Sequence, residues 1–235
     1  MRRYFGVTAA LILGASVASA QIKVDAGLPS YQKASGVSGK LNSVGSDTMN
    51  NNVMTLWAEG FLKLYPNVKV QVEGKGSSTV PPALIAGTAQ FGPTSRAMRA
   101  TEIDQFESKY GFKPTQLRTY YAALAVYVNK DNPVEKLTLA QVDAVFSKHR
   151  RKGFKQNVTT WGQLGLTGDW AGRPISLYGR NSASGTYGFF KEHSLGNGDY
   201  KDSVKAQPGS ASVMQGVTGP LRHRLLGHRL QDVGG

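Results

Sequence analysis

One arrangement recurs three times along this sequence: an apolar strand pattern, a turn rich in Gly, Ser and Thr, and then a helix pattern. The three turns occupy residues 45–49 (GSDTM), 74–79 (GKGSST) and 179–186 (GRNSASGT). Repeated strand–turn–helix units predict an α/β fold built on mostly parallel sheets. Ligands of such sheets bind outside the carboxyl ends of the strands, where these turns lie. The turns are therefore the first candidates for a binding site.

The third turn has the residues expected of an oxyanion site. It follows a predicted strand at 175–178 and precedes a predicted helix at 187–190. A helix start offers unpaired N–H groups and the positive end of the helix dipole. Gly185 permits close approach of a ligand, and the Arg180 guanidinium can bind two oxygens at once. Further donors are the hydroxyls of Ser182, Ser184 and Thr186. The alternative is that Ser184 only caps the helix.

Composition excludes several kinds of site. The 235 residues are 40% hydrophobic and 18% charged, which is typical of a soluble globular protein. A net charge of +13 attracts anions, but only residues 149–152 form a dense basic run and no base-reading motif accompanies them. We therefore expect no nucleic-acid partner. The chain has no Cys and four His, so we expect no metal, no cofactor and no lipid-modified Cys.

The first residues have the pattern of a secretory signal. Arg2 and Arg3 precede an apolar run at 7–17, which is too short to span a bilayer, and Ala18-Ser19-Ala20 is typical of a cleavage site. We expect a signal peptide at 1–20 and an irregular leader at 21–39.

Four further elements are predicted between the second and third turns. Residues 89–96 read as a short strand and turn, and Thr101 to Asp104 resemble a capping box for a helix at 101–110. The near-continuous apolar run at 120–129 predicts a strand buried on both faces. Thr138 is expected to cap a helix at 139–146.

The three turns, together with residues 91–96 (FGPTSR), resemble the phosphate-binding proteins of ABC importers. The resemblance covers about residues 40–217 and implies a type II periplasmic-binding-protein fold. In that fold two α/β lobes with mixed, mostly parallel sheets are joined by two crossing strands and close over the ligand. Lobe one would be 40–120, lobe two 121–217, and 120–129 the first crossing.

The resemblance implies a set of phosphate contacts, position by position. The matching residues are Thr48, Met49, Ser77, Ser95, Arg180, Ser184, Gly185 and Thr186. Weaker candidates beside them are Ser46, Asp47, Ser78 and Arg96. Members of the family have an Asp near the end of the motif that corresponds to residues 91–96, and that Asp accepts the proton of a protonated phosphate. This chain has Ser95 or Arg96 there instead. Asp47 is the candidate replacement.

The implied function is capture of inorganic phosphate in the periplasm, without catalysis, and delivery to the membrane permease of an ABC importer by a monomer. A different reading is a secreted phosphatase or Ser hydrolase with Ser184 as nucleophile. His193 would be its base, but no acid is placed to orient it, and no carboxylate cluster suggests a metallophosphatase. A basic nucleic-acid binder is the third reading.

The sequence changes character after Val217 and loses its likeness to the family. Back-translated with suitable codons and read one base later, Gly219 to Asp232 become DRYGIGYSAIGYK, which resembles the family's continuation. We therefore expect residues 218–235 to be a frameshift product, with the C-terminal part of lobe one missing. Such a fragment would bind phosphate weakly or be non-functional. The alternative is a natural basic tail.

Overall fold

The computed structural model describes residues 25–219. The predicted signal peptide lies outside the described residues, as do residues 220–235 of the predicted tail. The chain separates into two units, 1–35 and 36–235. In the first unit, residues 25–35 form turns and coil, and the Gly27 N–H donates to Asp25 Oδ1 at 2.8 Å. The helices and strands described below belong to the second unit.

The first sheet is a parallel pair, β1 (Gly39–Gly45) and β2 (Val68–Gly74), in register from Gly39 opposite Val68 to Gly45 opposite Gly74. Parallel strands need a long crossover. Here it consists of α1 (Asp47–Met49), a π-helical turn η1 (Asn50–Met54) and α2 (Thr55–Leu64). The strands expected before the first two turns are present, and the helix expected after the first turn begins inside that turn, at Asp47.

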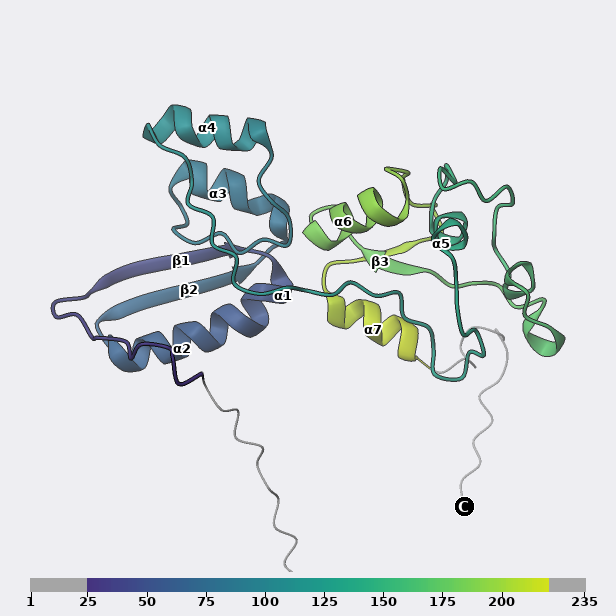
Figure 1. Ribbon diagram of the computed structural model, residues 1–235, viewed down its shortest axis with the longest axis horizontal. Helices are drawn as coiled ribbons and strands as arrows, with labels where there is room; N and C mark the ends of the chain where they lie inside the picture. The colour runs from purple at the N-terminus through teal and green to yellow at the C-terminus, as the bar shows by residue number, and fades with distance from the viewer. Residues whose placement is uncertain (1–24, 220–235) are drawn as a thin grey trace, which may run out of the picture. The chain divides into compact units, whose positions relative to one another are not determined.

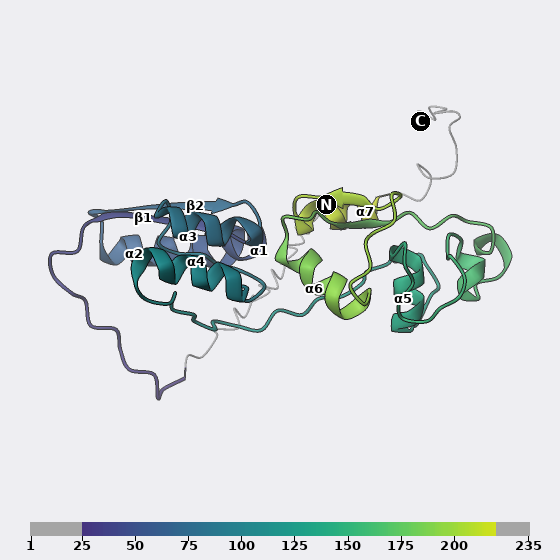
Figure 2. The same ribbon diagram turned by 90° about the horizontal axis from the view of Figure 1, so that it is seen from above.

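Helices lie on both faces of this sheet, with α2 on one face and α3 (Val80–Ala86) on the other (Figure 1). The fourth helix, α4 (Ala100–Tyr110), packs beside α3 (Figure 2). Pro81 stands in the first turn of α3, where a missing N–H costs nothing, and Gly87 ends that helix with φ 81°. Residues 89–96 form a single bridge from Phe91 to Ser43 instead of the predicted short strand.

The capping predictions had opposite outcomes. Thr138 caps α5 (Leu139–Phe146) as predicted, because its Oγ accepts from the Gln141 N–H at 3.2 Å. The prediction at Thr101 was wrong. The helix starts one residue earlier, and the Glu102 carboxylate accepts from the Arg99 N–H at 2.8 Å.

The second sheet is also a parallel pair, β3 (Tyr178–Arg180) and β4 (Lys205–Gln207), with α6 (Gly185–Ser194) and α7 (Ser210–Thr218) packed against β3 (Figure 1). The strand predicted at 175–178 lies too early in the sequence, because the observed strand β3 begins at Tyr178. Ile175 donates its N–H to Thr159 O at 2.8 Å, and only the later residues pair with β4. The buried core of this part is formed by residues of α5 and α6 and of the segments that pack on them. It contains Val142, Ala144, Val145, Val158, Leu177, Phe190 and Leu195.

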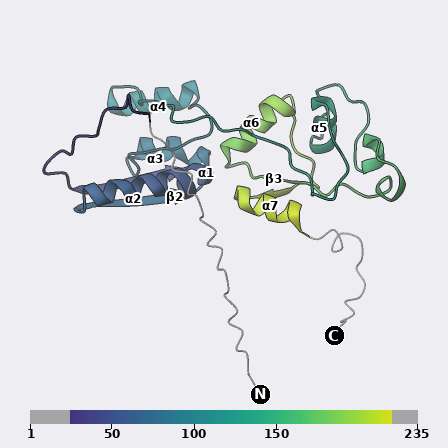
Figure 3. The same cartoon turned by 60° about the horizontal axis from the view of Figure 1, so that its bottom comes forward.

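The apolar run at 120–129 is not a buried strand, which corrects the sequence-based prediction. It is an extended coil between α4 and α5 with no arrow drawn along it (Figure 3), and Tyr121 is 99% exposed. Burial on both faces needs strands on both edges and helices above and below. Within residues 25–219 no strand pairs with this run, and its large apolar residues are 37% to 99% exposed.

Across that same range, no helix combines the length and the apolar character needed to cross a bilayer.

Candidate functional site

The second and third polar turns meet through contacts that leave no room for a Cβ atom. The Ser78 N–H donates to Ala183 O at 3.1 Å, and a Cβ on Gly76 would lie 2.5 Å from the same oxygen. A Cβ on Gly185 would lie 2.5 Å from both Ser77 Oγ and Ser95 Oγ. Glycine is therefore required at both positions for the turns to approach one another.

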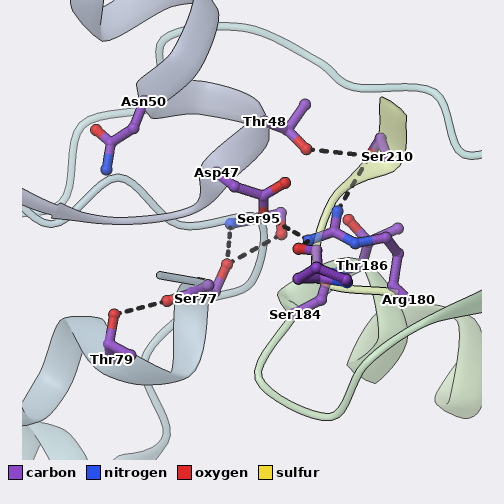
Figure 4. A network of polar contacts seen from close by, with 12 residues as sticks. Asp47, Thr48, Asn50, Ser77, Thr79, Ser95, Arg180, Ser184, Thr186 and Ser210 are labelled. Carbon is purple, nitrogen blue, oxygen red and sulfur yellow. Dashed lines mark hydrogen bonds and ion pairs between the residues drawn. The ribbon is translucent and has the colours of Figure 1, made fainter. Parts of the chain in front are cut away.

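Figure 4 shows the hydroxyls of Ser77 and Ser95 as a pair, and the Cβ contacts of Gly185 place that residue against both. Ser77 Oγ and Ser95 Oγ are 3.1 Å apart, and Ser77 Oγ also accepts from the Ser95 N–H at 3.1 Å. Ser77 is only 1% exposed. Ser95 comes from the 91–96 motif, so two of the predicted motifs contribute to this pair. Each hydroxyl can donate one hydrogen bond and accept others, which suits the oxygens of a small anion.

Arg180 ends β3 and carries the buried positive charge of the site; its residue is 6% exposed. Its Nη2 donates to Asp47 Oδ1 at 2.5 Å and to Pro208 O at 2.9 Å, and its Nη1 donates to Ser210 Oγ at 3.0 Å. The buried Nε–H has no hydrogen-bond partner in the part of the chain that the structure describes. A buried donor without a partner is costly, so this N–H is a candidate to bind a ligand.

Asp47 is the counter-ion of Arg180, although 133 residues separate them in the chain. It lies in the first turn and is buried. The cost of burying either charge alone is offset by the other. The sequence pointed to both residues but gave no sign that they pair.

Ser184 caps α6, because its Oγ accepts from the Thr186 N–H at 3.1 Å. The helix-cap interpretation is therefore correct locally, and it places the first turn of α6 beside Arg180 (Figure 4). Capping leaves the other first-turn N–H groups of this ten-residue helix available. Ser184 and Gly185 are both buried at this end.

The first turn contributes Thr48 and Met49, which are part of α1, and Ser46, which directly precedes that helix. Ser46 is buried and donates its N–H to Pro93 O at 2.7 Å, while Thr48 Oγ1 lies 3.4 Å from Ser210 Oγ. Asn50 anchors this turn: it accepts from Ser43 Oγ at 2.9 Å and donates to Glu73 O at 2.7 Å. Each of the three predicted turns therefore contributes residues to the site.

Two predicted residues point elsewhere. Arg96 donates from both Nη atoms to the Glu102 carboxylate, at 2.9 and 2.8 Å, and this hydrogen-bonded pair lowers the pKa of Glu102. Ser78 is exposed, and its N–H rather than its hydroxyl makes the contact with the third turn.

Ser210 and Pro208 belong to the cluster but were missed from sequence. The signal was present, since residues 205–218 are a fourth strand–turn–helix unit with the turn Pro208-Gly209-Ser210. That strand has only three residues and lacks an apolar pattern, so it did not stand out.

A hydrolytic arrangement around Ser184 is not formed. His193 lies nine positions further along α6, about 13 Å away at the rise of an α-helix, and its ring packs on Phe189 at 4.1 Å between centroids. Between residues 25 and 219, no three His, Cys, Asp or Glu side chains gather where they could hold a metal.

The comparison with protein families agrees with this architecture. Residues 31–222 match the PBP superfamily domain, and the chain belongs to that superfamily. The α/β fold class expected from the sequence is thereby confirmed.

Its relatives define the branch, that of the phosphate-binding proteins named PstS. The chain is 55% identical over 221 residues to the phosphate-binding protein PstS of Pseudomonas aeruginosa PAO1, covering 94% of this chain and 68% of that protein. The X-ray structure of a putative phosphate ABC transporter substrate-binding protein with bound phosphate, from Clostridium perfringens, is 26% identical with a TM-score of 0.62, over 77% of this chain and 67% of the other. An ABC-type phosphate transport receptor from Vibrio cholerae, 23% identical over 76% of this chain and 67% of the other, shares the fold with a TM-score of 0.52.

Proposed function

We propose that the cluster around Arg180 binds inorganic phosphate, and that the chain delivers it to the membrane permease of an ABC importer without catalysing a reaction. One observation carries this proposal. The Arg180 residue is 6% exposed, and its guanidinium keeps a buried Nε–H without a partner among the described residues while its Nη1 donates to the hydroxyl of Ser210. An anion with several oxygens would satisfy that donor and the hydroxyls together.

Each proposed contact has a physical role. Arg180 supplies charge, Ser77, Ser95 and Thr48 supply hydroxyls, and the first turn of α6 supplies N–H groups. The proposed N–H donors are those of Gly185 and Met49, whereas Thr186 contributes its hydroxyl because its N–H is engaged by the Ser184 cap. Ser184 fixes the helix start, and Ser46 and Ser78 support the backbone of their turns. Arg96 is left out of the set because Glu102 occupies its guanidinium.

Asp47 is the proposed acceptor for the proton of a protonated phosphate. Oδ1 already accepts from Arg180, which leaves Oδ2 to accept from a ligand O–H. A fully ionised oxyanion such as sulfate has no such proton and meets a buried carboxylate, whose repulsion is weakly screened. The site would therefore favour phosphate over sulfate.

The lobes we propose are 40–120 and 121–217, because each of these ranges contains one parallel sheet and the helices packed on it. Export to the periplasm depends on the predicted signal at 1–20, and a monomer suffices because every proposed contact comes from one chain.

Titration of the purified chain with inorganic phosphate by isothermal calorimetry tests the proposal. We expect binding that is lost in Arg180→Ala and kept in Arg118→Ala, which removes an exposed positive charge without touching the cluster. Sulfate should bind weakly to the unmodified chain. Equal loss in both variants would mean that overall charge, and not this site, holds the anion.

The hydrolase interpretation predicts ester hydrolysis that disappears in Ser184→Ala. The position of His193 argues against it, since a general base must lie within hydrogen-bond reach of the nucleophile. We expect no turnover of p-nitrophenyl phosphate above the rate of the Ser184→Ala variant.

A further inference from the structure

Ser210 is the first residue of α7 and contacts two members of the site from outside the predicted set. Its Oγ accepts from Arg180 Nη1 at 3.0 Å and lies 3.4 Å from Thr48 Oγ1, a residue 162 positions earlier (Figure 4). One hydroxyl thus links the cation of β3 to the first polar turn.

The hydroxyl differs in kind from the other acceptors around Arg180. Asp47 neutralises charge, and the carbonyl of Pro208 can only accept, whereas a hydroxyl accepts and donates at the same time. Ser210 Oγ therefore orients the guanidinium plane through Nη1 without cancelling its charge. The contact with Ser210 itself therefore removes no positive charge from the site.

The Ser210 hydroxyl can also donate one hydrogen bond through its own proton. With a lone pair engaged by Arg180 Nη1, its proton is free to point at Thr48 Oγ1. Thr48 then accepts this bond, and its own proton is directed away from Ser210. Chains of hydrogen bonds in which each donor polarises the next are mutually strengthening.

We propose that Ser210 is a positioning residue for oxyanion binding: it holds the Arg180 guanidinium in place and turns the Thr48 hydroxyl outward as a donor to the anion. This inference rests on the proposed function, because the anion it serves is inorganic phosphate. Ser210 is itself exposed, so substitutions there leave the core packing intact.

Three variants of the full chain test this role by calorimetric titration with inorganic phosphate. We expect Ser210→Ala to weaken binding about tenfold, since a hydrogen bond to a charged group is lost. Ser210→Thr keeps the hydroxyl and should restore affinity to within about threefold of the unmodified chain. Ser212→Ala, on the same helix, removes a hydroxyl that makes no contact with the cluster and should bind like the unmodified chain.

The link to Thr48 is tested by a double-mutant cycle. If Ser210 acts on phosphate partly by directing Thr48, then Thr48→Val and Ser210→Ala together cost less than the sum of their separate effects. Strict additivity overturns the link between the two hydroxyls.

A readout without ligand tests the hold on Arg180. Rotation of the Arg180 guanidinium about its Nε–Cζ bond, followed by ¹⁵N NMR with the signal assigned by its loss in Arg180→Lys, should be faster in Ser210→Ala and unchanged in Ser210→Thr. Unchanged rotation in Ser210→Ala overturns the positioning role.

The outcomes separate the two proposals. If the unmodified chain binds phosphate and Ser210→Ala binds equally well, only the role of Ser210 is overturned. If the unmodified chain binds no phosphate, the proposed function falls, and the role of Ser210 in phosphate binding falls with it.

Discussion

The polar turns are buried and the apolar run at 120–129 is exposed, which is the opposite of what their compositions suggest. Ser77, Ser184 and Arg180 are polar or charged and yet buried, while Tyr121 in the apolar run is 99% exposed. Burial of the turns is tolerated because most of these polar groups have partners: Ser77 bonds to Ser95, Arg180 to Asp47, and Ser184 to the Thr186 N–H. The described residues cover the apolar run only in part: Val128 is 37% exposed and Asn129 donates to Val217 O at 3.0 Å, whereas Tyr121 faces solvent. Burial therefore follows the neighbours that the fold supplies as much as the residue's own polarity.

The largest expected effect comes from breaking the buried ion pair of the site. Asp47→Ala leaves the buried Arg180 charge uncompensated and should lower the free energy of unfolding by about 3–5 kcal/mol. Urea denaturation followed by circular dichroism measures it. The control Asp131→Ala breaks an exposed pair with Lys130 and should change little. If the two variants lose equal stability, burial of the pair is irrelevant.

The next effect tests the tight approach of the turns. Gly76→Ala places a Cβ 2.5 Å from Ala183 O at φ 93°, and should destabilise the fold by about 2–3 kcal/mol and weaken phosphate binding. Gly153 also has φ 93° but has nothing within 4 Å of its would-be Cβ. Gly153→Ala therefore shows the cost of the dihedral angle alone. The clash between the turns is refuted if Gly76→Ala is no worse in thermal denaturation.

A smaller effect concerns the motif at 91–96. The pKa of Glu102 is lowered by its hydrogen bonds from Arg96, so the pair stabilises the fold above the ordinary pKa of 4.5 and loses this contribution as pH falls below it. Glu102→Gln should cost roughly 1 kcal/mol at pH 7 and flatten the acid side of the stability profile. Chemical denaturation between pH 7 and pH 3 measures both. A profile parallel to that of the unmodified chain would contradict the prediction.

The smallest effect is expected in the apolar run. Tyr121→Ser should change the free energy of unfolding by less than about 0.5 kcal/mol, because its ring already faces solvent. Tyr65→Ser, at a residue only 3% exposed, should cost about 3–5 kcal/mol by the same measurement. A large loss in Tyr121→Ser would mean that another part of the chain covers the run.

Local patterns were enough to predict much of the framework. Apolar strand patterns predicted β1 and β2, Thr138 predicted the start of α5, and the Gly and Ser turns marked the ends of strands where the cluster lies. These features depend on neighbours in the sequence. The third strand was misplaced, because pairing with β4 and not its own apolar pattern sets where it begins.

The sequence by itself determined the parallel α/β units, the polar turns between them and the choice of Arg180 and the hydroxyl residues as binding candidates. Only the tertiary structure decided that Asp47 pairs with Arg180, that Glu102 occupies Arg96, that Ser210 links Arg180 to Thr48, and that residues 120–129 stay exposed. The physical reason is range. Turn and helix propensities act over a few residues, whereas hydrogen bonds, ion pairs and burial depend on which distant segments the fold brings within a few ångströms.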